Sequence, residues 1–229
     1  MSRPYSFLLN KKYLLIAVIS VLCLAGVYRG AETYLAKVRV PPEERLTVAL
    51  DKTINSSAFR FRMAVKIGDD TISKVEGERV APDGVHIKGT MQDLPVEFIH
   101  TGDKTYVKGY WSDRWTCLEG NKMAESELFI TEFNPLGNFN FKDIPVVKEI
   151  KDKKTKLKVL EFSPIVQNSL MELNYDNYFY RVWVDPKQQV ITKALIQAQG
   201  KIKDNNKLEI NLEIWDHNNK QIKIEQPDV

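Results

Sequence analysis

The sequence predicts a mainly β protein of the α+β type, in which a curved antiparallel sheet of about ten strands forms a half-barrel. Polar and apolar residues alternate in five successive segments between Ala58 and Tyr110, and a period of two places alternate side chains on opposite faces of a sheet. Turn residues separate these segments about every 8 to 12 positions, which is typical of sequential antiparallel strands. The same alternation returns after Tyr178.

The apolar segment near the N-terminus predicts export or membrane anchoring. Residues 13–28 are almost entirely apolar and follow Lys11 and Lys12. As a helix they would span about 24 Å of a hydrocarbon core that is ~30 Å thick. One interpretation is an uncleaved signal anchor, a transmembrane helix whose basic end stays in the cytoplasm. The other is a signal peptide cleaved near Cys23-Leu24-Ala25. Leu22 stands where lipoprotein processing needs a small residue.

These features divide the chain into a signal anchor or signal peptide (1–28), a juxtamembrane stalk (29–40) and an extracytoplasmic domain (41–229). The net charge is +3, but residues 1–40 carry six basic residues and one acidic residue, so the domain itself is close to neutral. A nucleic-acid-binding domain normally carries a clear basic surplus, so we expect no nucleic-acid partner. The expected location is the cell membrane, with a single span and the C-terminal domain outside the cytoplasm. A cleaved leader would make the protein secreted.

The domain is expected to begin with a helix that the sheet wraps. Pro41-Pro42-Glu43-Glu44 is typical of a first helical turn. An apolar stripe follows at Leu46, Ala49, Leu50 and Thr53-Ile54. Midway along the chain we expect one or two inserted helices and a hairpin: helices at Ala124–Thr131 and Pro164–Leu173, and hairpin strands at Val146–Ile150 and Lys156–Phe162.

The C-terminal third returns to strands. These are Tyr178–Asp185, Val190–Gln199, Lys207–Trp215 and a last edge strand at Lys220–Glu225. The strand at Lys207–Trp215 alternates cleanly, which predicts a buried face formed by Leu208, Ile210, Leu212 and Ile214.

The sequence contains no constellation that points to catalysis. His86, His100 and His217 stand far apart, and no HxH, HxxxH or CxxC spacing marks a metal site. GxSxG, P-loop and GxGxxG motifs are also missing. Cys117 is alone in the domain, since Cys23 lies in the leader, so no disulfide framework is expected. We therefore expect a protein that is not an enzyme and that needs no metal or cofactor.

The apolar face of the sheet is the candidate ligand site. A half-barrel with few helices leaves an apolar cavity between the first helix and the sheet, and a lipid tail fits such a space. The predicted lining residues are Leu46, Leu50, Phe59, Phe61, Met63, Val65, Ile87 and Phe98. The alternative is a filled core, which leaves an interaction or scaffold domain of the cell envelope that acts through a protein partner.

Three stretches of the chain carry a family resemblance: Ala58–Phe61 after the first helix, Gly102–Lys108 leading to Trp115, and Tyr180–Asp185 before a hairpin. With the order helix, meander, helical insertion and C-terminal hairpins, residues 43–225 resemble the LolA/LolB-like group. That group includes the lipoprotein-localisation factors and the LppX/LprG-type lipid carriers. Its members hold acyl chains between a curved sheet and its helices without catalysis.

This resemblance implies a membrane-tethered, non-catalytic binder of lipid or another apolar ligand. The chain departs from the group by lacking a lipobox cysteine. A tethered receiver or sensor therefore fits better than a soluble shuttle.

Overall fold

The computed structural model of the chain describes residues 40–109, 112–119, 134–152, 155–167, 169–201 and 207–228, together with Val21. The chain divides into two units, and the second of them begins at Pro42. The leader and stalk expected in residues 1–40 lie outside the described residues, apart from Val21 and Val40, as does the helix expected at Ala124–Thr131. Within the described part of the chain, no helix combines the length and the apolar character that a membrane span requires.

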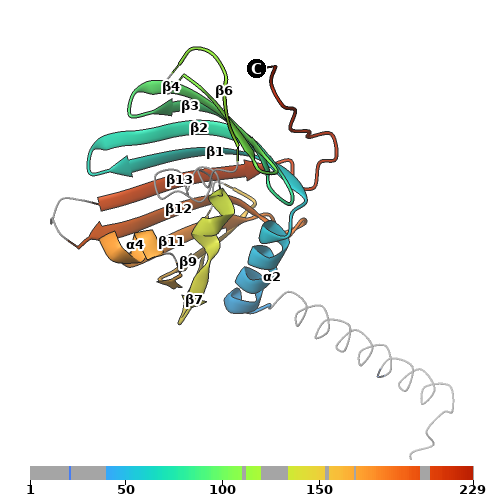
Figure 1. Cartoon of the computed structure of the whole chain (residues 1–229). Coiled ribbons are helices and arrows are strands. Elements are labelled where there is room, and N and C mark those ends of the chain that lie inside the picture. The colour runs from blue at the N-terminus through green and yellow to red at the C-terminus, as the bar shows by residue number, and fades with distance from the viewer. Residues whose placement is uncertain are drawn as a thin grey trace, which may run out of the picture. The chain divides into compact units, whose positions relative to one another are not determined.

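The second unit is built on one curved antiparallel sheet of eleven strands (Figure 1). The strand order is β6-β5-β4-β3-β2-β1-β13-β12-β11-β9-β8. The strands are β1 (Ala58–Ile67), β2 (Asp70–Val80), β3 (Gly84–Met91), β4 (Leu94–Thr101), β5 (Lys104–Lys108), β6 (Thr116–Glu119), β8 (Val147–Ile150), β9 (Lys158–Phe162), β11 (Tyr175–Val184), β12 (Ile191–Gly200) and β13 (Lys207–Trp215). The mainly β prediction is confirmed. The sheet contains two runs of sequential strands: the first meander, β1 to β6, and the second meander, β8, β9 and β11 to β13. The two meanders join where β1 pairs with β13, a contact between segments far apart in the sequence.

Helix α2 (Pro42–Ile54) begins as the sequence predicts. Glu43 and Glu44 lie in its first turn and Lys52 in its last, which suits the helix dipole at both ends. Figure 1 shows this helix, in blue, below the sheet beside the yellow segment that carries β7. Its buried residues are Leu46, Ala49 and Thr53. The expected stripe is wrong at Ile54, which is 45% exposed because the helix ends there.

The segment between the two meanders forms small elements. The 3-10 helix η2 (Pro135–Phe139) leads into β7 (Phe141–Asp143), which pairs with β10 (Ile165–Val166) as a separate two-stranded sheet. The hairpin of β8 and β9 is confirmed. The helix predicted at Pro164–Leu173 is wrong in its first half, because Ile165 and Val166 pair with β7. The helix here, α4, is Ser169–Asn174.

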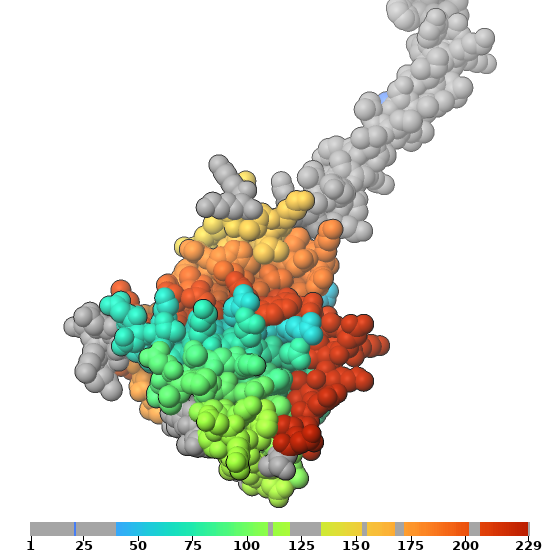
Figure 2. All heavy atoms as spheres, turned by 90° about the horizontal axis from the view of Figure 1, so that it is seen from above, coloured from blue at the N-terminus to red at the C-terminus, as the bar shows by residue number. Residues whose placement is uncertain are grey.

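The edge strand predicted at Lys220–Glu225 is absent from the described structure, in which residues 217–228 form turns and irregular chain. Both edges of β13 are already paired, with β1 and β12, so no free edge lies beside it. Asp216 and Asn218 have positive φ angles and turn the chain away. The segment after them packs Ile222 into a buried position, and Gln226 accepts a hydrogen bond from Tyr106 Oη at 3.1 Å. Figure 2 shows this red segment beside the green strands.

The core lies on one face of the sheet, which we call the inner face. The predicted face of β13 is confirmed: Leu208, Ile210, Leu212 and Ile214 are all buried. They belong to one continuous cluster with side chains of α2, η2 and most of the strands. Burying each such side chain contributes about 1.5–3 kcal/mol.

Candidate functional site: the inner face of the sheet

The predicted lining residues lie together on the inner face. Seven of them are at most 7% exposed and belong to the core cluster: Leu46, Phe59, Phe61, Met63, Val65, Ile87 and Phe98. Leu50 is partly buried and packs against the same cluster. The structure therefore brings the whole predicted set into one apolar interior, formed by α2, β1, β3 and β4.

Strand pairing arranges these side chains in rows across the sheet. Phe61 on β1 faces Gly77 on β2, and the row continues through Ile87 on β3 and Phe98 on β4. A β-carbon on Gly77 would lie 2.6 Å from Phe61 Cζ and 2.7 Å from the backbone oxygen of His86. Only glycine leaves room for the Phe61 ring at this point. The Phe61 ring therefore lies over β2 on the inner face, in the space that a side chain at position 77 would occupy.

Helix α2 is fixed to the second meander by polar contacts. Thr53 Oγ1 donates to the carbonyl of Ala49 at 2.6 Å and accepts from the backbone N–H of Ile191 at 2.8 Å. Arg45 forms an ion pair with Glu149 on β8. The main contacts of α2 are accordingly with β8, β12 and η2. The inner side chains of β2 to β5 lie outside this main set of helix contacts.

His217 links three segments at the end of α2. Its Nε2 lies 3.1 Å from the carbonyl oxygen of Ile191, and its Nδ1 lies 2.9 Å from Ser56 Oγ. Burial lowers the pKa of His217, opposed by the hydrogen bond to the Ile191 carbonyl. A neutral ring satisfies both contacts, donating from Nε2 to the carbonyl and accepting the Ser56 hydroxyl proton at Nδ1. The ring therefore joins the chain just after α2 to the start of β12.

An aromatic cluster closes the interior near η2. The ring of Phe141 packs edge-on against the rings of Phe162 and Tyr180, which stack on each other. Burial raises the pKa of Tyr180, and its hydroxyl donates to the backbone oxygen of Asn138 at 2.9 Å. Asn138 is itself 1% exposed. Sequence reasoning missed Asn138, because an asparagine beside Gly137 in a Pro-containing segment is typical of an exposed loop.

A hollow of about 500 Å³ opens between β10, α4 and the start of β11. Val166 and Tyr178 lie in its wall and also belong to the core cluster. Val166 faces Phe141 in the small sheet, which places the hollow next to the aromatic cluster. Ile165, 53% exposed, lies at this hollow. The hollow therefore has an apolar margin and adjoins the interior.

The outer face of the sheet carries balanced charge. Basic and acidic residues alternate in one row across seven strands: Lys108, Glu97, Lys88, Glu76, Arg62, Glu213 and Lys193. Arg62 pairs with Glu76 at 2.6 Å and Glu213 at 3.6 Å. Cross-strand pairs of opposite charge stabilise a sheet modestly. Along this row no run of basic residues is left for an anionic polymer.

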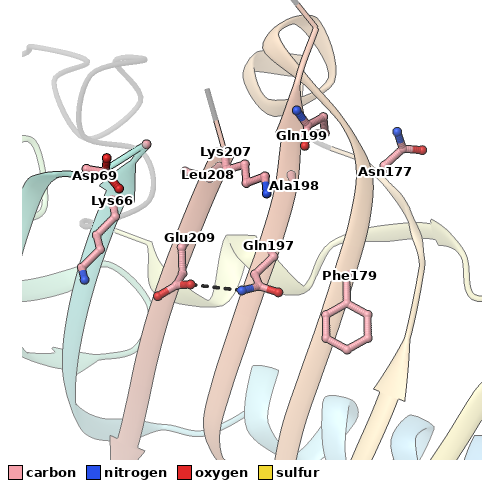
Figure 3. A pocket seen from close by; sticks show the side chains of 11 residues that line it. Lys66, Asp69, Asn177, Phe179, Gln197, Ala198, Gln199, Lys207, Leu208 and Glu209 are labelled. Atoms are coloured by element: carbon pink, nitrogen blue, oxygen red, sulfur yellow. Dashed lines mark hydrogen bonds between the residues drawn. The ribbon is translucent and has the colours of Figure 1, made fainter. Parts of the chain in front are cut away.

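A second hollow, of about 540 Å³, lies at the end of β1, β13, β12 and β11 (Figure 3). Its wall is mixed in character, with Phe179 beside amide and charged groups. The dashed line in Figure 3 is the 3.0 Å hydrogen bond from Gln197 Nε2 to Glu209 Oε2. This bond joins two of the polar side chains in the wall.

The histidines and the domain cysteine do not converge. His86 lies on the outer face, 2.9 Å from Glu97, whereas His100 lies on the inner face with its Nδ1 2.9 Å from Thr105 Oγ1. Cys117 is a free, partly buried thiol opposite Tyr106. Across the described ranges, no three His, Cys, Asp or Glu side chains are grouped as a metal site would need.

The fold and the inner face define a class: a mainly β domain whose curved sheet carries an apolar interior closed by a short helix. No family model matches the chain, and no curated protein matches it. Among solved structures, the chain is similar to a LolA superfamily protein from Nitrosomonas europaea, with 10% identity, 76% of this chain and 92% of that chain covered, and a TM-score of 0.34.

The chain is also similar to MucB, with 16% identity, 76% of this chain covered and a TM-score of 0.38. It spans 56% of the MucB chain. A structure of MucB in complex with MucA(peri) matches at 7% identity, over 76% of this chain and 94% of that chain, with a TM-score of 0.14. A resemblance to the LolA-like group is thus also found among solved structures, at low identity and low TM-scores. At these TM-scores it carries no argument about function, which rests on the geometry of this chain.

Proposed function

We propose that this chain is a membrane-tethered, extracytoplasmic binding protein that holds a lipid or another apolar ligand without hydrolysing it. The observation that carries the proposal is the continuous apolar inner face, which extends from Val107 on β5 to Leu160 on β9. Helix α2 makes its main contacts with the β8 and β12 side of that face. The part formed by β1 to β5 is therefore the place where an acyl chain would lie. Its lining is Phe59, Phe61, Met63, Val65, Ile87 and Phe98, with Leu46 and Leu50 on the helix.

The test of ligand binding uses the full chain purified in mild detergent. Native mass spectrometry of the protein should show co-purified lipid. Displacement of a fluorescent fatty acid by saturated fatty acids of increasing length should then give affinities that rise by about 0.8 kcal/mol per added methylene until the site is full. Affinities that stay flat with chain length, together with protein free of lipid, would contradict the proposal.

The tether is supported by the apolar segment at residues 13–28 and its flanking Lys11 and Lys12. A cysteine at Lys187, an exposed position in the turn between β11 and β12, reports topology without touching the core. Lys187→Cys should react with an impermeant thiol reagent in intact cells and remain in the membrane fraction. Reaction only after lysis would place the domain in the cytoplasm and overturn the proposed location. Release of the labelled domain into the medium would indicate a cleaved leader.

A second candidate is an envelope interaction domain with a filled core, which acts by protein contact. Two observations favour it: the low exposure of the predicted lining residues, and the exposed apolar side chains Val146, Ile150, Ile165 and Leu173 around β8, β10 and α4. Chemical crosslinking in cells, followed by Ile150→Glu and Leu173→Glu, separates the candidates. Loss of a crosslinked partner from a protein that carries no lipid would favour the interaction domain.

A further inference from the structure

Asn138 carries an unpaired hydrogen-bond acceptor inside the core. Among the described side chains that are buried, its Oδ1 is the polar atom without a hydrogen-bond partner. The residue is 1% exposed, so bulk solvent does not satisfy this oxygen. Buried polar groups in folded proteins are nearly always hydrogen-bonded, and an exception calls for a physical reason.

The orientation of the amide follows from its neighbours. Asn138 Nδ2 donates to the carbonyl oxygen of Pro135 at 3.0 Å. The reverse orientation would set Oδ1 against that carbonyl oxygen, and two acceptors repel each other. The oxygen is therefore the atom that points away from the η2 backbone. Because the backbone carbonyl of Asn138 accepts from Tyr180, the whole residue is fixed in place.

The surroundings of Asn138 are apolar and adjoin a hollow. Tyr180, which bonds to Asn138, packs against Phe141, and Phe141 faces Val166 in the wall of the hollow between β10, α4 and β11. Tyr178, two residues before Tyr180, lies in the same wall. Two side chains, Tyr180 and Phe141, thus lie between Asn138 and the wall of the hollow. A ligand with an apolar body that entered from this side would have to displace them to bring a polar group near Asn138.

We propose that Asn138 Oδ1 anchors the polar end of the bound apolar ligand, and that this end is neutral and carries a hydrogen-bond donor. This inference rests on the proposed ligand-binding function. A hydroxyl, an amide N–H or a protonated carboxylic acid supplies the donor that the oxygen lacks. An ionised carboxylate has acceptors only, so it cannot pair with Oδ1 and is excluded from this position.

The test compares two ligands that differ in the donor: a long-chain primary alcohol and the methyl ether of the same alcohol. Their affinities for the full chain in detergent are measured by displacement of a fluorescent fatty-alcohol probe, which is neutral. Each affinity is corrected by the partitioning of that ligand into empty detergent micelles, which removes the difference in hydrophobicity. We expect a corrected preference for the alcohol of about tenfold in the wild-type protein.

Two variants at the same 3-10 helix show whether Asn138 causes the preference for the alcohol. Asn138→Leu removes the acceptor and should abolish the preference for the alcohol. Asn134→Leu is the matched control, because Asn134 begins the same turn with an exposed side chain, and it should keep the preference. Far-ultraviolet circular dichroism establishes that each variant is folded. If Asn138→Leu does not fold, Asn138→Ala, which also removes the acceptor and is smaller, takes its place and should likewise abolish the preference.

The outcomes separate the two proposals. A wild-type protein that binds alcohol and ether equally after correction overturns the anchor at Asn138 and leaves the binding function standing. A preference that persists in Asn138→Leu also overturns the anchor, because the donor then pairs elsewhere. A wild-type protein that binds neither ligand overturns the proposed function and the anchor with it.

Discussion

The hydroxyl oxygen of Thr53, near the end of α2, accepts a hydrogen bond from the backbone N–H of Ile191 at the start of β12 at 2.8 Å. Both residues are fully buried. The same hydroxyl donates to Ala49 within the helix, so one side chain ties α2 to the second meander. The first helix is thereby held against strands that follow it by more than 130 positions.

Thr53→Val should destabilise the domain by about 1–3 kcal/mol, because the Ile191 N–H is left buried without an acceptor. Valine has nearly the shape of threonine, so packing changes little. Thr53→Ser, which keeps the hydroxyl, is the control and should lose less stability. Urea unfolding followed by tryptophan fluorescence measures both. Equal losses in the two variants would show that the methyl group, not the hydrogen bond, matters.

Gly77→Ala should destabilise by about 1–3 kcal/mol through overpacking. The added β-carbon meets the Phe61 ring and the backbone oxygen of His86, and the backbone cannot move aside easily. Gly137→Ala is the comparison, since the nearest atom there is the Asn134 side-chain amide at 3.3 Å. Thermal unfolding of the two variants should give the lower midpoint for Gly77→Ala. The reverse ranking would mean that the Phe61 ring does not occupy the space over β2.

Ile210→Ala should cost about 2–5 kcal/mol, because Ile210 is fully buried in the core cluster. Ile210→Asp should prevent folding, since an unpaired carboxylate is costly in an apolar interior. Glu209→Ala, on the outer face of the same strand, should be nearly neutral. Circular dichroism and urea titration measure the three variants. Native-like melting of Ile210→Asp would show that the two faces of β13 are exchanged.

His217 should make the stability pH-dependent. Its pKa in the folded state lies below the unfolded value of 6.5, so the unfolded chain binds the proton more readily. The stabilising contribution is complete above pH ~6.5 and declines as the pH falls from there toward the lower folded pKa. His217→Gln keeps one donor and one acceptor but does not titrate in this range. Stability measured from pH ~7 to ~5.5 should fall more steeply in the wild type than in the variant. Parallel profiles would contradict this role.

Met63→Trp should block binding of an acyl chain more than it disturbs folding, if the ligand lies against β1. Met63 is fully buried on the inner face opposite Val75 and Leu212, and a larger ring there would fill the space of a tail. Arg62→Trp adds the same ring to the outer face and is the control. Probe displacement and urea unfolding are measured on both. Unchanged affinity in a folded Met63→Trp protein would place the ligand elsewhere.

The strands of this protein were predictable where one face is buried and the other is solvated. Ala58–Ile67 and Lys207–Trp215 alternate so regularly that both the strand and its buried face follow from the residues alone. The eight candidate lining residues come from the same reasoning, and the structure brings them into one interior. Local patterns also place α2, because its proline, acidic first turn and apolar stripe all act within one or two turns.

The C-terminal segment and the middle of the chain were less predictable, because their conformation depends on which edges are free. Lys220–Glu225 has the composition of a strand, but β1 and β12 already occupy both sides of β13. Pro164 is typical of the start of a helix, yet the next two residues, Ile165 and Val166, pair with β7. Whether such a segment forms a strand, a helix or irregular chain depends on partners that are distant in the sequence. A short stretch of sequence does not contain those partners.

The sequence by itself determined the alternation of polar and apolar residues, the turns and therefore the curved sheet with an apolar face. Only the tertiary structure decided which polar groups lie inside that face. Thr53, His217 and Asn138 are ordinary polar residues in the sequence, and the burial of Thr53 and Asn138 and the partial burial of His217 follow from tertiary packing. Hydrophobic periodicity is a property of neighbours along the chain, whereas a buried hydrogen bond needs a donor and an acceptor that meet only after folding.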